Sequence, residues 1–270
     1  KFQTVQVKYE SSNGVTIPMF ITWKEGQNIK LDGKNPVLLY GNGGFDVSVT
    51  PKFQEETLCF LEHGGILAVP NIRGGGSFGK RWHKEGTVLN KQNTFDDFIA
   101  AAEYLIDSNY TSKQKLAIMG TGNGGLLVGA CMTQRPDLFQ VALPSTGFFD
   151  MLRYDKLRYG SAFVAEYGSS DGLETFENLR SYSPLHNIGL GRFPATFITT
   201  TDTDTQITPA HSYKFAATLQ ANNTSELPAF IKIYTHKKDT TTTSISKRME
   251  ESTDKLSFMM YYLQMKLSSE

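Results

Sequence analysis

Residues 120–125 read GTGNGG and stand between the apolar runs LAIM and LLVGA. An apolar run, a glycine-rich turn and a second apolar run are typical of a strand, a sharp turn and a helix. Many hydrolytic enzymes carry a nucleophilic serine on such a turn, in the pattern G-x-S-x-G. The central position here is Gly122, which has no side chain and offers no hydroxyl for attack on a carbonyl carbon.

Nucleotide and metal chemistry find little support in the sequence. No acidic residue lies about 20 positions beyond the turn at a second strand end, where a dinucleotide ribose would be bound. No Lys-Ser or Lys-Thr pair follows, as a phosphate-binding P-loop requires. The five histidines are not spaced with carboxylates for a metal site. We therefore expect no cofactor and no metal.

Strands and helices alternate along the chain, which favours a mostly parallel sheet covered on both faces. The predicted strands are TVQVKY, TIPMFITW, PVLLYG, GGILAVPNI, LAIMG, VALPS, PATFITT and AFIKIYT. The first two, joined by SSNG, are expected to form an antiparallel hairpin. Helices are predicted over 51–63, 94–108, 124–134, 209–221 and 246–266. Asn93 or Thr94 is expected to cap the second helix, with Asp96 and Asp97 near its positive end.

The bulk composition is that of an ordinary globular protein. The 270 residues are 39% hydrophobic and 20% charged, and their formal net charge is +0. A neutral chain is not steered toward nucleic acid or an acidic membrane, and no apolar run is long enough to span a bilayer. Cys59 and Cys131 are predicted to pack in the core. No signal peptide is visible, so we expect a cytoplasmic protein.

Several long sequence words, taken in order, resemble the peptidase domain of the prolyl oligopeptidase family. They are LLYGNGGF, AVPNIRGGGSFG, KQNTFDDFIAAAEYLI, GTGNGGLLVGA, YSPLHN and TTTDTDTQITPAHSYKFAATLQ. The resemblance runs from about residue 1 to the C-terminus and implies an α/β-hydrolase fold. In that family a β-propeller covers a serine peptidase domain. The chain shows no propeller-like array of strands, so we expect residues 1–270 to form one peptidase domain.

The resemblance also assigns the catalytic positions of a Ser-His-Asp triad. The family's nucleophile, in G-G-S-N-G-G, falls on Gly122, and its acid falls on Asp204. Its base, in A-G-H-G-A-G-K-P, falls on Asp239 when the motif is counted back from KRMEE. Asn123 matches the family's backbone oxyanion donor, whereas the oxyanion tyrosine of G-Y-G-G-F is replaced by Asn42. The acid position is therefore retained, and the nucleophile and base are lost.

The same resemblance implies a pocket for a proline ring. Phe163 stands at the position of the stacking tryptophan, and Gln206 replaces the substrate-binding arginine. Phe45 and Tyr167 match the other aromatic residues of the pocket. The three rings have a second interpretation as ordinary core residues, and the sequence alone does not separate the two. The pocket implies a peptide or proline-like ligand.

These losses predict a hydrolase fold without hydrolase chemistry, since no acyl-enzyme forms without a hydroxyl at position 122. One alternative is an active peptidase that cleaves after proline, with the triad alignment shifted and His236 as base. Another is a hydrolase that uses Asp204 and Asp239 as paired carboxylates within about 10 Å of each other. We expect the remaining histidines, His83, His186 and His211 among them, to be structural. Segments present in the family but absent here predict exposed apolar surface and self-association.

Overall fold

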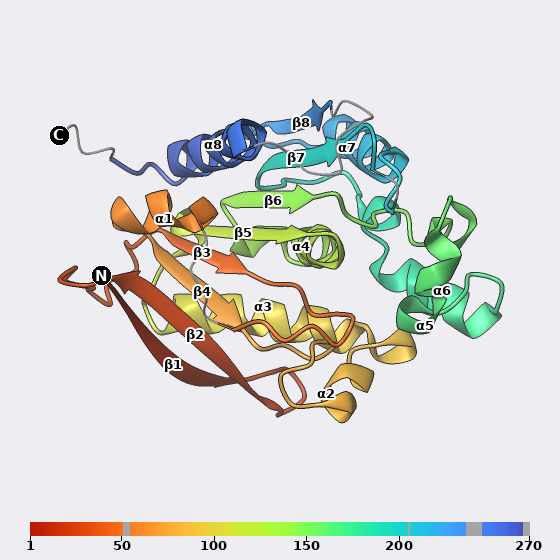
Figure 1. The fold of residues 1–270 in the computed structure, drawn as a ribbon, viewed down its shortest axis with the longest axis horizontal. Coiled ribbons are helices and arrows are strands. Elements are labelled where there is room, and N and C mark those ends of the chain that lie inside the picture. Colours follow the sequence, from red (N-terminus) through yellow and green to blue (C-terminus); the bar gives the residue numbers. More distant parts are fainter. Residues whose placement is uncertain (51–54, 205, 236–244, 267–270) are drawn as a thin grey trace.

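A computed structural model describes residues 1–50, 55–204, 206–235 and 245–266. Within these residues the chain forms an eight-stranded sheet in the order β1-β2-β4-β3-β5-β6-β7-β8 (Figure 1). The β1–β2 and β2–β4 pairs are antiparallel, and the other pairs are parallel. This arrangement confirms the predicted α/β-hydrolase fold, and each predicted strand forms. The strands are β1 (Phe2–Glu10), β2 (Thr16–Lys24), β3 (Val37–Tyr40), β4 (Ile66–Pro70), β5 (Leu116–Thr121), β6 (Val141–Ser145), β7 (Ala195–Thr201) and β8 (Ala229–Tyr234).

The predicted helices also form within the described residues. They are α1 (Glu55–Glu62), α3 (Gln92–Asp107), α4 (Asn123–Gln134), α7 (Ala210–Asn222) and α8 (Ile245–Tyr262). The first four residues of the predicted helix 51–63 lie outside the described part of the chain. Three further α-helices of the described residues were not predicted: α2 (Lys80–Lys84), α5 (Val164–Tyr167) and α6 (Leu173–Tyr182). The first two are single turns and too short for a periodic pattern. No helix in the described ranges is long and apolar enough to cross a membrane.

Alternate residues of each central strand enter different halves of the core. In β3, Leu39 packs with residues of α3, α4 and α7, whereas Leu38 packs with residues of α1 and α8. Ile118 and Ala117 of β5 divide in the same way. Because successive side chains of a strand point to opposite faces, these runs of β-branched and aliphatic residues are buried on both sides. The sheet is thus a rigid layer whose strand ends are fixed in position.

The N-terminus of α3 differs from its prediction. The helix begins at Gln92, and the preceding residue, Lys91, makes no side-chain capping bond. The hydroxyl of Thr94 instead donates to the carbonyl of Arg73, and Asn93 donates to the carbonyl of Glu85. The predicted cap is therefore wrong, because tertiary contacts use the side chains that would have formed it.

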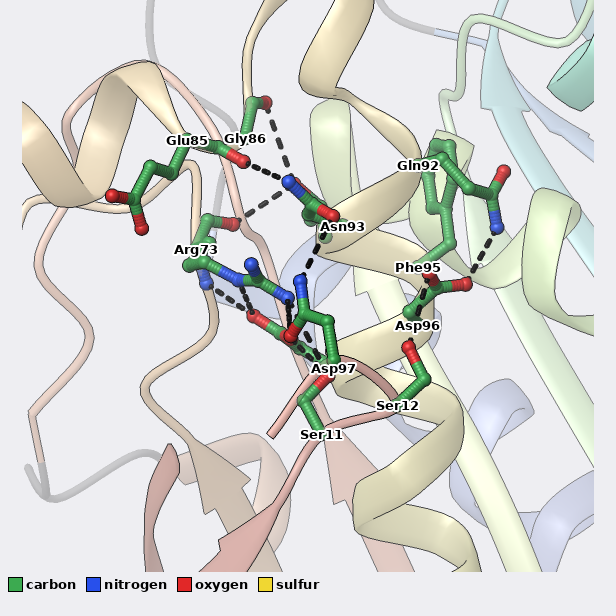
Figure 2. Close-up of polar contacts among 12 residues, drawn as sticks. Ser11, Ser12, Arg73, Glu85, Gly86, Gln92, Asn93, Phe95, Asp96 and Asp97 are labelled. Atoms are coloured by element: carbon green, nitrogen blue, oxygen red, sulfur yellow. Dashed lines mark hydrogen bonds and ion pairs between the residues drawn. The ribbon is translucent and has the colours of Figure 1, made fainter. Parts of the chain in front are cut away.

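Asp97 was expected to favour the helix dipole but forms a buried ion pair with Arg73. Nη2 of Arg73 lies 2.6 Å from Oδ1 of Asp97, and the two side chains are 2% and 0% exposed. Figure 2 shows this pair with Ser11, whose hydroxyl donates to the same carboxylate. The contact joins three parts of the chain: the β1–β2 turn, the segment after β4, and helix α3.

Candidate active site

The candidate site lies where parallel strands end. Strands β3, β5, β6 and β7 run in one direction, so the segments that follow them meet at one edge of the sheet (Figure 1). These segments carry the Asn42 loop, the Gly122 turn and the Asp204 loop, respectively after β3, β5 and β7. Ligands of open α/β sheets bind at this kind of edge.

The turn between β5 and α4 has the geometry of a nucleophile elbow. Gly122 adopts φ 63° and ψ −115°, a conformation that side chains rarely occupy. Around it the backbone is crowded, since a Cβ on Gly120 would lie 2.3 Å from the carbonyl oxygen of Gly124. A Cβ on Gly122 itself would meet only Cδ1 of Ile207, at 4.0 Å. Position 122 therefore has room for a side chain, but glycine supplies no hydroxyl there.

The oxyanion side of the site is built by Asn123 and the loop after β3. Asn123 is the first residue of α4, so its N–H belongs to the helix-terminal donors that lack an intrahelical acceptor. Its side-chain Nδ2 donates to the carbonyl of Asn42 over 2.6 Å. The Asn42 side chain accepts a hydrogen bond of 3.2 Å from the N–H of Gly44. The Asn42 side chain thus stabilises its own loop.

Asp204 lies in the loop between β7 and α7. Its Oδ1 accepts hydrogen bonds of 2.8 Å from the N–H groups of Gln206 and Ile207. Because Ile207 is also the neighbour of the space at Gly122, the acid position and the nucleophile position lie at the same site. Gln206 is exposed. The predicted base position, Asp239, and the alternative base, His236, lie outside the described residues.

The three predicted pocket aromatics come together. The rings of Phe45 and Phe163 make an edge-to-face contact at 5.7 Å, and Phe45 and Tyr167 make another at 5.8 Å. Phe148 contacts both Phe163 and Tyr167 from the core side. Phe45 is 38% exposed, whereas Tyr167 is fully buried and donates its hydroxyl to Oδ1 of Asn123 over 2.8 Å. Phe45 is thus the solvent-exposed ring of the cluster, and Tyr167 is a buried ring held by a hydrogen bond.

The buried ammonium group of Lys91, which was not among the predicted site residues, contacts this cluster from the protein interior. Nζ of Lys91 lies 3.0 Å from the carbonyl oxygen of Gly43 and 3.1 Å from Oε1 of Glu166. It also lies 5.4 Å from the centre of the Tyr167 ring. Oε2 of Glu166 is 2.8 Å from Nε2 of His83, so this histidine contacts the same carboxylate as Lys91. Only the three-dimensional fold joins these residues, since bonded partners among them are separated by up to 83 positions in the sequence.

A second group of serine, histidine and aspartate residues is structural. Ser183 Oγ lies 2.8 Å from Nδ1 of His186, whose Nε2 is 3.8 Å from Asp150. Ser183 is fully buried, and its oxygen accepts the N–H of Met151, so it is not presented to a substrate. Nδ1 of His211 accepts the N–H of Asp150, and burial lowers the pKa of His211 to about 4. His211 therefore binds the backbone at Asp150, whereas His186 contacts the side chains of Ser183 and Asp150.

Two other serines stand in the pattern G-x-S-x-G. Ser77 precedes the short helix α2, and its hydroxyl accepts a hydrogen bond from Asn71. Ser170 lies between α5 and α6 and donates to Asp155. Neither lies directly between a strand and a helix, so neither is an elbow nucleophile. In the described part of the chain, no group of three or more His, Cys, Asp or Glu residues is placed to hold a metal ion.

Comparison with known proteins gives one consistent result. A sequence model described as the prolyl oligopeptidase family matches residues 51–266. The chain is 48% identical over 263 residues to the prolyl endopeptidase of Elizabethkingia meningoseptica, covering 97% of this chain and 37% of that protein. It is 42% identical over 273 residues to the prolyl endopeptidase of Dictyostelium discoideum, covering 99% and 36%. The chain thus spans little more than a third of these relatives.

Solved structures agree with the sequence comparison. A structure of prolyl oligopeptidase B from Galerina marginata, bound to a 35mer hydrolysis and macrocyclization substrate, matches with a TM-score of 0.93 and 41% identity. The match covers 98% of this chain and 37% of that one. A structure from an analysis of two prolyl endopeptidases matches with a TM-score of 0.92 and 40% identity, over 100% of this chain and 38% of that one.

Proposed function

The chain belongs to the prolyl oligopeptidase family, and from this premise we propose that it is a peptidase domain that binds proline-containing peptides without hydrolysing them. The observation that carries the proposal is Gly122. This residue occupies the elbow between β5 and α4, in a positive-φ conformation that would strain a residue with a side chain. With a hydrogen atom in place of a side chain, the site has no oxygen to attack a peptide carbonyl.

The retained part of the site supports binding. Phe45 and Phe163 present an edge-to-face pair next to the elbow, with Phe45 open to solvent. A saturated proline ring packs well on such faces, which combine apolar area with few rotatable bonds. The N–H of Asn123 points from a helix N-terminus, where a peptide carbonyl oxygen finds a favourable partial positive charge. Binding of a proline ring in such a pocket does not require a nucleophile at the elbow.

A working peptidase is the competing function, because the curated relatives are named prolyl endopeptidases. It needs a hydroxyl at the elbow and a base beside it. The two other serines in G-x-S-x-G patterns, Ser77 and Ser170, lie in other loops, which favours the binding function. Paired carboxylates at Asp204 and Asp239 stay a hypothesis, since Asp239 lies outside the described residues.

Calorimetric titration of the purified chain with a blocked Gly-Pro amide tests the proposal. We expect saturable binding and no amine release during prolonged incubation at the same concentrations. Phe163→Ala should weaken binding about tenfold, because it removes the ring contacts that form the pocket wall. Phe78→Ala is the matched control, since Phe78 is an exposed ring that packs on Trp82 instead. Turnover of the amide, or no binding at all, would contradict the proposal.

A further inference from the structure

We propose that Lys91 is the positioning residue of the candidate site. It closes a ring of polar contacts that fixes the position of the aromatic pocket relative to the elbow. This inference rests on the proposed peptide-binding function. Lys91 touches neither the elbow nor the exposed face of the pocket, so its effect on a ligand would pass through the residues it holds. The ring is defined as Lys91, Gly43, Asn42, Asn123, Tyr167 and Glu166.

The ring can be followed bond by bond. Lys91 binds the Gly43 carbonyl, and the preceding carbonyl, that of Asn42, accepts from Nδ2 of Asn123. Oδ1 of Asn123 accepts from the Tyr167 hydroxyl, and Tyr167 adjoins Glu166 in α5. Glu166 returns to Lys91. The ring therefore joins the loop after β3, the start of α4, and α5, which carry the predicted site residues Asn42, Asn123 and Tyr167.

Lys91 is suited to this role because it makes two different contacts at once. Its side chain is fully buried, and Glu166 is 4% exposed. Burial lowers the pKa of Lys91, while the nearby Glu166 carboxylate opposes that change and favours the ammonium ion. An ammonium has three donors, so one can bind the carboxylate while another holds the Gly43 carbonyl. An apolar residue could fill the space but could not hold the loop.

The loop that Lys91 holds is conformationally strained. Phe45 adopts φ 57°, in the left-handed region that bulky residues seldom occupy. Two positions earlier, Gly43 has φ 68° and is packed against Thr94 and Ile72. Such a conformation persists when surrounding contacts over-determine it. Release of the Gly43 carbonyl would let Phe45 relax away from Phe163 and open the pocket wall.

A pair of variants separates positioning from general stability. Lys91→Met keeps the side-chain length but leaves the Glu166 carboxylate buried without its ammonium partner. Lys91→Met/Glu166→Gln removes both charges, which restores charge balance in the interior. We expect both variants to bind a blocked Gly-Pro amide at least about tenfold more weakly than the original chain. The double variant should nevertheless regain most of the unfolding midpoint that Lys91→Met loses.

Hydrogen exchange provides a readout that needs no ligand. In both variants, amides of residues 41–45 and 163–167 should exchange faster, while those around the Arg73–Asp97 pair should not change. Lys84→Met, at an exposed lysine, is the matched control. If the original chain binds no ligand, the proposed function fails, and the exchange data still test the ring. The ring is overturned if exchange is unchanged in both variants, or if the double variant regains binding together with stability.

Discussion

The hydroxyl of Tyr167 donates a hydrogen bond of 2.8 Å to Oδ1 of Asn123, so one bond joins the buried ring of the Phe45–Phe163–Tyr167 cluster to the first residue of α4. Tyr167 is fully buried, and burial raises the pKa of its hydroxyl well above the usual value. The hydroxyl therefore stays protonated and keeps donating across the physiological pH range. The aromatic cluster and the start of α4 are therefore joined by a hydrogen bond that does not titrate in this range.

Tyr167→Phe should destabilise the protein by about 1–3 kcal/mol, because Oδ1 of Asn123 then lacks a partner in a buried setting. Urea unfolding followed by circular dichroism measures the change. Tyr159→Phe is the control, since Tyr159 is 63% exposed and should lose little. Equal stability of Tyr167→Phe and the original chain would show that the bond contributes nothing.

Gly122→Ser should fold but should not restore hydrolysis. The new Cβ has room, with only Cδ1 of Ile207 at 4.0 Å, yet φ 63° is unfavourable for a residue with a side chain. We expect a loss of about 1–3 kcal/mol in unfolding free energy. Gly122→Ala should lose a similar amount, since both variants adopt the same backbone.

Restoration fails in this account because a serine hydroxyl also needs a base to accept its proton. The family resemblance predicts that Asp239 stands at the base position, where no imidazole would accept it. The measurement compares amine release from a blocked Gly-Pro amide by Gly122→Ser and Gly122→Ala. Release by the serine variant well above that by the alanine variant would place a working base beside the elbow.

Asp97→Asn should be far more damaging than the same change at its neighbour. The buried Arg73 would then face a neutral amide, and breaking a buried ion pair in this way costs about 3–5 kcal/mol. Asp96 is partly exposed and bonds to Ser12 and Gln92, so Asp96→Asn should cost below about 1 kcal/mol. Urea midpoints of the two variants give the comparison. Similar losses at both positions would contradict the account of the pair shown in Figure 2.

Stability should fall on mild acidification because of His211. Burial holds its pKa at about 4 in the folded chain, whereas an unfolded histidine has a pKa of about 6.5. Between these values the unfolded state binds more protons, so this contribution is complete above pH 6.5 and declines as pH falls toward 4. From pH 7.5 to 4.5 the loss should be about 2–3 kcal/mol.

The pH effect is isolated by comparing the original chain with His211→Gln in urea at both pH values. The variant loses the hydrogen bond that the N–H of Asp150 donates to the His211 ring. Its unfolding free energy should nevertheless decline less over the same pH interval. His186 is the second histidine whose pKa burial lowers, so His186→Gln tests the neighbouring contribution. An identical decline in His211→Gln and the original chain would remove His211 as the cause.

The fold was predictable because its signal is local and repeated. Runs such as VLLY, ILAVP and LAIMG are short, aliphatic and followed by turn residues, and each became a buried strand. Of the glycines in GTGNGG, only Gly122 lies in the predicted turn, because Gly120 belongs to β5 and Gly124 and Gly125 belong to the first turn of α4. The meeting of Phe45, Phe163 and Tyr167 came instead from the family resemblance, because no local pattern links residues more than 100 positions apart.

The parts that escaped prediction depend on tertiary contacts. Asp97 has the position of a dipole-favouring residue, yet Arg73, 24 residues away, determines where its carboxylate points. The sequence around Lys91 favours a solvated residue before a helix, and only the folded structure brings Glu166 into contact with it. Self-association, a cytoplasmic location and the role of Asp239 stay predictions. Light scattering at several concentrations tests the first of these directly.

The most direct test of the central claim is covalent labelling of the purified chain by an organophosphonate, followed by intact mass measurement. The prolyl endopeptidase of Elizabethkingia meningoseptica, treated in parallel, is the positive control for reagent and conditions. With Gly122 at the elbow, we predict no mass increase in this chain at reagent concentrations that fully label the control. Stoichiometric addition of one phosphonyl group, mapped to any serine or threonine of this chain, would contradict the account.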